Sequence, residues 1–197
     1  MRLLQSEEEL KNLIASDDWM MSILSLVETL QLPDWWVCAG IIRSKVWDYL
    51  HDKEERTPIA DIDVIYFDKE NLAEEVEKQY EQELRKLSPN EPWSVKNQAR
   101  MHVLNGSKPY QSAVDGISHF PEIPTAIGVK LSDGVLEIAA PYGIHLLGAG
   151  IVEPTSFYLE NKDAYAIYRQ RIQQKQWHLS WSELKIHFSQ IQNVIHV

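Results

Sequence analysis

The pattern of hydrophobic and polar positions along the chain predicts short buried strands that alternate with amphipathic helices. Runs rich in β-branched and aromatic residues are typical of buried strands, and they cover residues 35–40, 59–67, 93–95, 126–131 and 135–140. Apolar residues at helical spacing cover residues 41–50, 68–87, 98–105, 112–120 and 161–176. This mixture predicts an α+β fold, in which a small mixed sheet packs against helices.

N-cap residues predict two further helices near the amino end of the chain, and they also indicate where the helix at 68–87 begins. Ser6 and Glu9 form a capping box, and Asp17 or Asp18 can cap a second helix. Asp68 is expected to cap the long charged helix at 68–87. The predicted fold therefore carries helices before its first strand.

The carboxyl end of the chain is expected to form a helical extension of the core. A boundary near Pro141 separates residues 1–140, the core with its N-terminal helices, from a mostly helical segment at 141–197 that packs on it. Trp177 and Trp181 are expected to anchor this segment, because large aromatic side chains bury much area at little entropic cost. The whole chain is expected to form one compact domain.

The strand at 59–67 carries two carboxylates, Asp61 and Asp63. A strand repeats every second residue, so both side chains emerge on one face. Like charges in an apolar element repel each other, and partial burial raises their pKa values. A divalent cation removes both penalties, because Mg²⁺ takes carboxylate oxygens and keeps positions open for phosphate oxygens. The pair indicates a metal site for phosphoryl or nucleotidyl transfer. The tripeptide alone favours an ordinary pair at a strand end, solvated or bonded to backbone amides.

The residues upstream favour the metal site. The strand at 35–40 delivers Gly40 to the start of a helix, where backbone N–H groups can approach an anion closely. Arg43 follows in the first turn, where the helix dipole already favours anions. A strand, a glycine, a helix and a strand with two carboxylates together describe a phosphate site beside a metal site.

At this point the sequence resembles the DNA polymerase β-type nucleotidyltransferase superfamily, and more narrowly a branch of bacterial nucleotidyltransferase-like proteins. The stretches that carry the resemblance are residues 39–43, 46–48, 61–68, 96–102 and 136–143. The resemblance implies the nucleotidyltransferase fold and the transfer of a nucleoside monophosphate from a nucleoside triphosphate to a hydroxyl. It also implies Mg²⁺ or Mn²⁺ on Asp61 and Asp63, with the triphosphate at Gly40. Two features depart from the superfamily: Ile41 replaces a Gly or Ser, and the segment from Gly40 to Asp61 is longer.

Two further residues are candidates for the site. In the superfamily a third carboxylate lies on a later strand, and Glu137 could complete the metal site or deprotonate the attacking hydroxyl. The alternative is a solvated strand residue paired with Lys130 across the hairpin. Arg100 could bind two phosphate oxygens at once, or it could be an ordinary surface charge.

Composition and charge narrow the partners. The net charge is −10, from 19 basic and 29 acidic residues, without a basic run. Because nucleic-acid affinity comes largely from neutralised phosphates, a small molecule or a protein fits as the acceptor more easily than a long nucleic acid. The single cysteine, Cys38, lies in an apolar strand and is expected to be a core residue in a reducing compartment. The start lacks the apolar stretch of a signal peptide, and no run reaches membrane-spanning length. A cytoplasmic location is expected.

Three functions stay open at this stage. The leading hypothesis is a metal-dependent nucleotidyltransferase with an unidentified acceptor. A catalytically inactive nucleotide- or protein-binding module on the same fold is supported by Ile41 and by the long segment before Asp61. Phosphoryl transfer or hydrolysis at a similar two-carboxylate site is the third. Pyrophosphate release, orthophosphate release and binding without turnover distinguish them.

Overall fold

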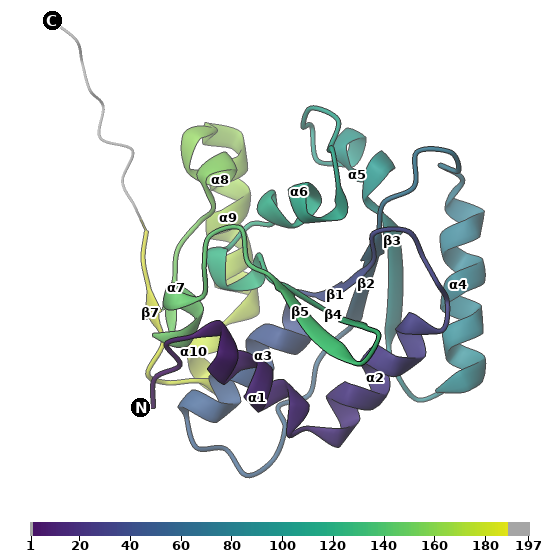
Figure 1. The fold of residues 1–197 in the computed structure, drawn as a ribbon. Coiled ribbons are helices and arrows are strands. Elements are labelled where there is room, and N and C mark those ends of the chain that lie inside the picture. Colours follow the sequence, from purple (N-terminus) through teal and green to yellow (C-terminus); the bar gives the residue numbers. More distant parts are fainter. Residues whose placement is uncertain (1, 189–197) are drawn as a thin grey trace, which may run out of the picture.

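The computed structural model describes residues 2–188, which form a five-stranded sheet with helices on both faces (Figure 1). The helices are α1 (Glu7–Ala15), α2 (Asp18–Glu28), α3 (Gly40–Leu50), α4 (Glu74–Leu87), α5 (Gln98–Leu104), α6 (Ala113–Ser118), η1 (Ile123–Thr125), α7 (His145–Gly148), α8 (Ser156–Glu160), α9 (Lys162–Lys175) and α10 (Trp177–Ser180). The strands are β1 (Trp36–Cys38), β2 (Ile62–Tyr66), β3 (Trp93–Asn97), β4 (Gly128–Ser132), β5 (Val135–Ala139), β6 (Ile151–Val152) and β7 (Lys185–Ile186).

The main sheet has the strand order β3-β2-β1-β4-β5. β2 and β3 are parallel, and the other neighbouring pairs are antiparallel. A second, two-stranded sheet joins β6 to β7. The small mixed sheet among helices confirms the predicted α+β fold.

Alternation along the strands divides the core between the two faces of the main sheet. One face, with Ile62 and Val64 of β2, packs against α1, α2, α3 and α4 in the larger apolar cluster. The other face, with Trp36, Cys38 and Ile65, packs against α6. Figure 1 shows α5 and α6 on the side of the sheet away from α1 and α2. Asp63 alternates with Ile62 and Val64, so it belongs to the face that α6 covers.

Most of the expected caps are present. Ser6 accepts a hydrogen bond from the amide of Glu9, and Asp17 accepts one from the amide of Met20. The prediction that Asp68 caps the long helix is wrong, because that helix begins at Glu74 and its N-cap forms no side-chain hydrogen bond. Asn97 instead holds residue 68 in an irregular segment, since it accepts from the amide and donates to the carbonyl of Asp68.

Asp48 joins three segments near the carboxyl end of α3. Its carboxylate accepts hydrogen bonds from the Thr57 amide at 2.8 Å, the Thr57 hydroxyl at 2.6 Å and the Trp181 indole N–H at 2.8 Å. The long segment before β2 is therefore anchored to α3, and so is the carboxyl end. The expected anchoring by Trp177 and Trp181 is confirmed, because both side chains are buried against Trp47.

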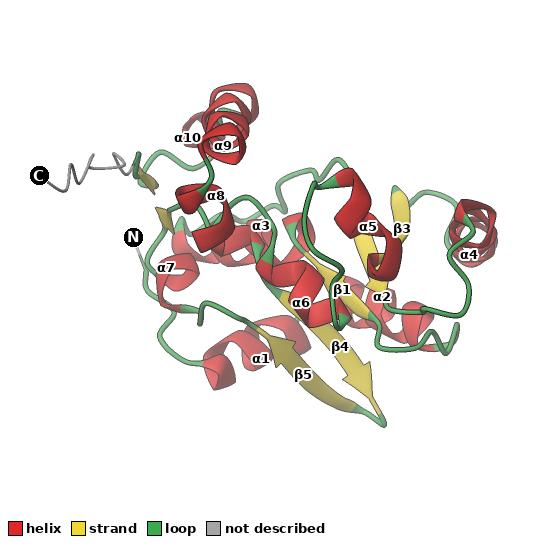
Figure 2. Cartoon of the chain, turned by 90° about the horizontal axis from the view of Figure 1, so that it is seen from above, coloured by secondary structure: helices red, strands yellow, loops and turns green. Residues whose placement is uncertain are grey.

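The carboxyl-terminal helices gather at one end of the molecule. Figures 1 and 2 show α8, α9 and α10 at this end and α4 at the opposite end. Across residues 2–188, none of these or the other helices is both long and apolar enough to cross a bilayer.

Candidate active site

Asp61 and Asp63 lie at the start of β2, in the middle of the sheet. Asp61 directly precedes the strand and is exposed, whereas Asp63 is partly buried. The register places Asp63 between Cys38 on β1 and Ser94 on β3. Cys38 is fully buried, and burial together with both aspartates raises its thiol pKa. The expected role of Cys38 as a core residue is confirmed, and its thiol is not a nucleophile.

Burial and the neighbouring Asp61 raise the pKa of Asp63 from 3.8 to about 6. A hydrogen bond from Ser94 and the charges of Arg171 and Arg43 oppose this shift without cancelling it. Within residues 2–188, neither aspartate has a cationic side chain at ion-pair distance. The site therefore holds two neighbouring carboxylates without a direct ion pair in the described chain, and the charges of Arg43 and Arg171 offset their repulsion only in part.

This pair has the donor chemistry of a divalent-cation site. Carboxylate oxygens are the ligands that Mg²⁺ and Mn²⁺ prefer, and a cation would remove the repulsion that raises the Asp63 pKa. Among the described residues no group of three or more acidic, histidine or cysteine side chains could hold a metal. Asp61 and Asp63 fit a cation that takes its remaining ligands from phosphate and water.

Gly40 begins α3 directly beside the carboxylates. A Cβ at this position would lie 3.7 Å from Nη2 of Arg43 and 4.0 Å from Oδ1 of Asp61. The preceding Ala39 has φ 61° and ψ −119°, a conformation that residues with side chains disfavour. No side chain caps the helix start. The turn thus aims uncapped backbone amides into the space between a carboxylate and a guanidinium.

Arg43 extends from the first turn of α3 into an aromatic setting. Its guanidinium donates to Thr125 Oγ1 at 2.9 Å and lies 4.4 Å from the ring centre of Trp177 and 5.1 Å from that of Trp47. Burial lowers its pKa to about 10, so it stays charged at neutral pH. Its Nε is buried and has no hydrogen-bond partner within residues 2–188. Arg43 is a fixed cation beside Gly40.

Two cavities adjoin the carboxylate pair. The first, which we name the Asp61 pocket, has a volume of about 200 Å³ and is lined by Asp61, Gly40, Arg43, Ser44 and Lys175, among others. The second, which we name the Gln98 pocket, has a volume of about 250 Å³, and its lining includes Asp63, Gln98, His119, Phe120, Tyr158 and Arg171. A group held between Asp61 and Asp63 could extend into both.

Sequence reasoning missed two cations that α9 contributes. Lys175 lines the Asp61 pocket, and no carboxylate within residues 2–188 lies at ion-pair distance from it. Arg171 lines the Gln98 pocket and pairs with the buried Glu122 at 2.6 Å. The available signal was their spacing, since residues four apart share one face of a helix. Nothing local to α9 indicates that this face turns toward β2.

The structure does not bring Glu137 to the carboxylate pair. Glu137 lies on β5, three strands from β2 or roughly 14 Å at the usual strand spacing, and its carboxylate pairs with Lys130 at 3.1 Å. The strand positions that flank Asp63 are Cys38 and Ser94, and neither is a carboxylate.

Arg100 also lies apart from the pair. Its Nε and Nη2 donate to both carboxylate oxygens of Glu77 on α4, at 2.7 and 2.6 Å. Glu77 is fully buried, and this hydrogen-bonded pair raises the pKa of Arg100. The guanidinium of Arg100 is therefore already bound by the Glu77 carboxylate, and this ion pair joins α5 to α4.

The fold, a five-stranded mixed sheet among helices, is the one found in solved nucleotidyltransferase structures. Residues 25–186 match the model of a protein family described as nucleotidyltransferase, and the chain belongs to this family. We conclude that the protein is a nucleotidyltransferase.

Two of the solved structures that are similar to the chain are informative here. One is a protein whose NMR structure reveals a CCA-adding enzyme head domain; it is 32% identical, covers 94% of this chain and 98% of its own, and has a TM-score of 0.84. The other is a CCA-adding enzyme in complex with CTP, 12% identical, with a TM-score of 0.56 and a match over 95% of this chain and 44% of its own. The second supports the fold alone. No curated protein matches the sequence significantly.

Proposed function

We propose that this nucleotidyltransferase moves a nucleoside monophosphate from a nucleoside triphosphate to a hydroxyl group, with Mg²⁺ or Mn²⁺ held by Asp61 and Asp63. The oxygen of the acceptor hydroxyl forms a bond to the α-phosphorus, the bond from that phosphorus to the bridging oxygen breaks, and pyrophosphate leaves. The hydroxyl proton passes to solvent or to a base. The observation that carries the proposal is the only partly neutralised aspartate pair beside Gly40 and Arg43.

The Asp61 pocket is the site for the polyphosphate. The amino end of α3 offers backbone N–H groups and the positive end of its dipole, and Gly40 leaves the approach to them open. Arg43 and Lys175 supply positive charge from two different helices. These groups hold the leaving pyrophosphate in a fixed position while charge develops on it. The cation would neutralise charge on the phosphoryl oxygens.

The acceptor is a small molecule or a protein in this proposal. The net charge of −10 opposes the approach of a long polyanion. The solved CCA-adding enzyme holds CTP, so CTP belongs among the nucleotides to be tested. The proposal gives no role to Glu137 and Arg100, because their side chains pair with Lys130 and Glu77.

Thermal unfolding with Mg²⁺ and each nucleoside triphosphate tests nucleotide binding. Ligand at a hundredfold excess over its dissociation constant is expected to stabilise the fold by about 2.7 kcal/mol. The double variant Asp61→Asn/Asp63→Asn should lose this stabilisation, and Glu137→Gln should keep it. If Glu137→Gln loses it and the double variant does not, the proposed metal site is wrong.

Product analysis separates transfer from the alternatives. Pyrophosphate release that depends on an added acceptor supports nucleotidyl transfer. Orthophosphate release would indicate hydrolysis. Metal-dependent binding without any product, across a broad set of hydroxyl compounds and proteins, would identify a member of the family that binds nucleotides without turnover.

A further inference from the structure

The Gln98 pocket differs in character from the Asp61 pocket. Its walls include the apolar side chains of Ile65, Met101 and Phe120, and Asp63 is its one carboxylate among the described residues. The cations that reach it are already paired: Arg171 with Glu122, and Lys96 with Glu77 and Glu81. The pocket is thus suited neither to a polyphosphate nor to a polycation.

Gln98 supplies a polar group that lacks a partner in the described chain. The residue is 4% exposed and lines the pocket. Within residues 2–188, no hydrogen bond engages its side-chain amide. Neither Oε1 nor Nε2 of Gln98 is among the fully buried, unpartnered polar atoms of the described chain, so the amide meets the cavity. It can exchange water for a ligand there.

Gly116 fixes the position of this amide. A Cβ at Gly116 on α6 would lie 2.6 Å from Oε1 and 3.0 Å from Cγ of Gln98. These distances are too short for a real contact, so Gln98 packs flat against the backbone of α6. The absence of a side chain at Gly116 leaves the space that the amide of Gln98 occupies.

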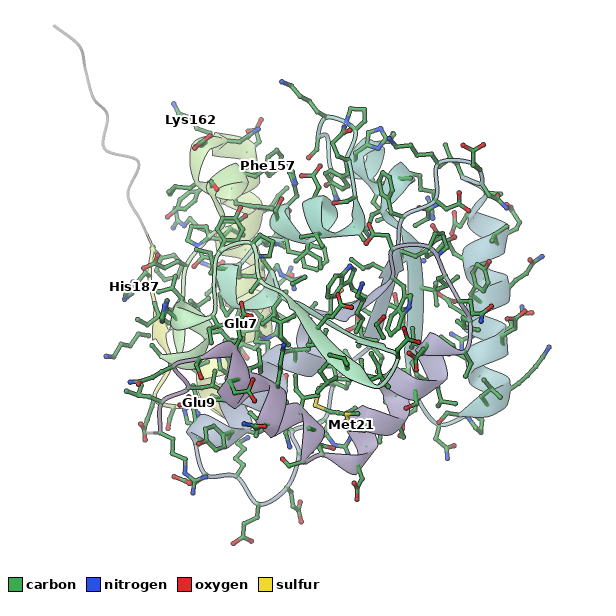
Figure 3. The ribbon with its side chains drawn as sticks, in the orientation of Figure 1. Glu7, Glu9, Met21, Phe157, Lys162 and His187 are labelled. Carbon is green, nitrogen blue, oxygen red and sulfur yellow. The ribbon has the colours of Figure 1, made fainter. Side chains whose placement is uncertain are left out.

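The aromatic side chains that line the pocket are His119, Phe120 and Tyr158, and the rings of Tyr110 and Phe157 support His119 without lining the cavity. The His119 ring lies 4.7 Å from the Tyr110 ring and 5.3 Å from the Phe157 ring, and Tyr158 lines the cavity beside it. Figure 3 shows Phe157 on α8, at the side of that helix that faces α6. Hydrogen bonding of His119 Nδ1 with the Asp115 carbonyl at 2.9 Å fixes the imidazole ring. Flat rings and apolar side chains suit a planar ligand.

We propose that the Gln98 pocket binds a nucleobase, whose edge pairs with the amide of Gln98 while apolar and aromatic side chains contact its faces. A primary amide presents a donor and an acceptor side by side, which matches the paired groups on the edge of a base. The inference rests on the proposed function, because the phosphate that links this base to the Asp61 pocket lies at the aspartate pair.

The base can come from either substrate. In nucleotidyl transfer the attacking oxygen and the leaving oxygen lie roughly in line, and the leaving pyrophosphate occupies the Asp61 pocket. The Gln98 pocket then receives either the base of the triphosphate or the base of a nucleoside acceptor. Both present the same edge to Gln98.

Calorimetric titration of Gln98→Leu tests the proposal, because leucine preserves the bulk of the side chain and removes the amide. The control is Gln82→Leu, the same change at an exposed position of α4. The probes are tripolyphosphate, the four nucleoside triphosphates and the four nucleosides, each with Mg²⁺. Gly116→Ala, which drives the amide into the cavity, is a second variant with the same expected losses.

Two results would support the proposal. A loss of about tenfold or more in triphosphate affinity, with tripolyphosphate binding unchanged, assigns the base to the triphosphate. A similar loss for a free nucleoside titrated in the presence of tripolyphosphate, with triphosphate binding unchanged, assigns the base to the acceptor. Gln82→Leu should behave as wild type in both series.

The proposal is overturned if both pocket variants bind every nucleoside and triphosphate as the wild type does. Failure of the proposed function looks different, because tripolyphosphate and triphosphates would then show no metal-dependent binding to the wild type, and Asp61→Asn/Asp63→Asn would change nothing. The nucleoside titration still tests the Gln98 pocket in that case.

Discussion

At the scale of single residues, a substitution at Gly40 is expected to have opposite effects on the stability of the fold and on triphosphate affinity. Gly40 lies in the first turn of α3, and an added Cβ would make only ordinary contacts with Arg43 and Asp61. Gly40→Ala should therefore stabilise the fold by about 0.5–1 kcal/mol, because it restricts the unfolded chain. The same methyl group occupies the approach to the helix start, so triphosphate affinity should fall about tenfold or more. Thermal unfolding without ligand and calorimetry with a triphosphate measure the two effects.

Gly134 offers a control for this prediction, because its substitution is expected to lower stability without affecting triphosphate binding. It has φ +78° in the turn between β4 and β5, and among the described residues no atom lies within 4 Å of the position that an added Cβ would take. Gly134→Ala should lower the free energy of unfolding by about 1 kcal/mol through backbone strain and leave triphosphate binding unchanged. A loss of binding in both variants would show that the effect at Gly40 is not local.

The raised pKa of Asp63 gives the metal-free protein a characteristic pH dependence. The folded-state pKa is about 6 and the ordinary value is 3.8, so the folded state holds this proton more tightly than the unfolded state. The contribution of Asp63 to stability is therefore greatest below about pH 4 and falls as the pH rises to about 6. Above that pH the ionised carboxylate costs about 2–3 kcal/mol.

Asp63→Asn should remove this cost in the absence of metal. At about pH 7 the variant should be more stable than the wild type, and the difference should shrink toward about pH 4. Magnesium binding has the opposite dependence, because the cation needs the ionised pair and gains affinity as the pH rises through about 6. Urea unfolding with a chelator, and again with Mg²⁺, follows both trends. A stability difference that is constant over this range would contradict the assigned cause.

At the scale of elements, the loop that carries Asp61 depends on Asp48. Asp48→Ala should lower the free energy of unfolding by about 3 kcal/mol, because it leaves several hydrogen-bond donors without their charged acceptor. It should also weaken triphosphate binding, since both the Thr57 segment and Trp181 line the Asp61 pocket. Asp52→Asn is the control, because the carboxylate of Asp52 pairs with Arg2 at the exposed surface and asparagine tolerates the positive φ of 52° at this position. Equal losses in the two variants would rule out the anchoring role.

At this scale the sequence predicted well those features of the elements that depend only on neighbouring residues. The strand at 59–67, the glycine at the start of α3 and the caps at Ser6 and Asp17 each follow from neighbouring residues. Asp68 failed as a cap because Asn97, far along the chain, holds its backbone. Glu137 was a reasonable candidate from alternation alone, and only the strand order places it three strands from the aspartates. Lys175 reaches the site through the packing of α9, which periodicity does not reveal.

At the scale of the whole molecule, the charge distribution predicts how the protein treats nucleic acids. The net charge is −10, and the cations at the two pockets are few among the described residues. Arg43 and Lys175 line the Asp61 pocket. Arg171, paired with Glu122, and Lys96, paired with Glu77 and Glu81, line the Gln98 pocket. A protein that bound a long single strand would release counterions, with log K falling by about 0.7 per contacted phosphate as log salt rises. In the proposed function the Asp61 pocket contacts one polyphosphate through Arg43 and Lys175, so the expected number of phosphate contacts is small.

Titration of a labelled single-stranded RNA that ends in a free ribose diol, at low and at moderate salt, measures this slope. We expect weak binding at both concentrations and a slope no steeper than that of a nucleoside triphosphate. An RNA slope of several units would show that a basic surface assembles around the site despite the overall charge, and would make a nucleic acid the acceptor. A shallow slope, combined with turnover on a small hydroxyl compound, would identify a small molecule as the acceptor. If the Gln98→Leu titration then assigns the base to the acceptor, the chemistry of the Gln98 pocket, an unpaired amide beside apolar side chains, sets which acceptors react.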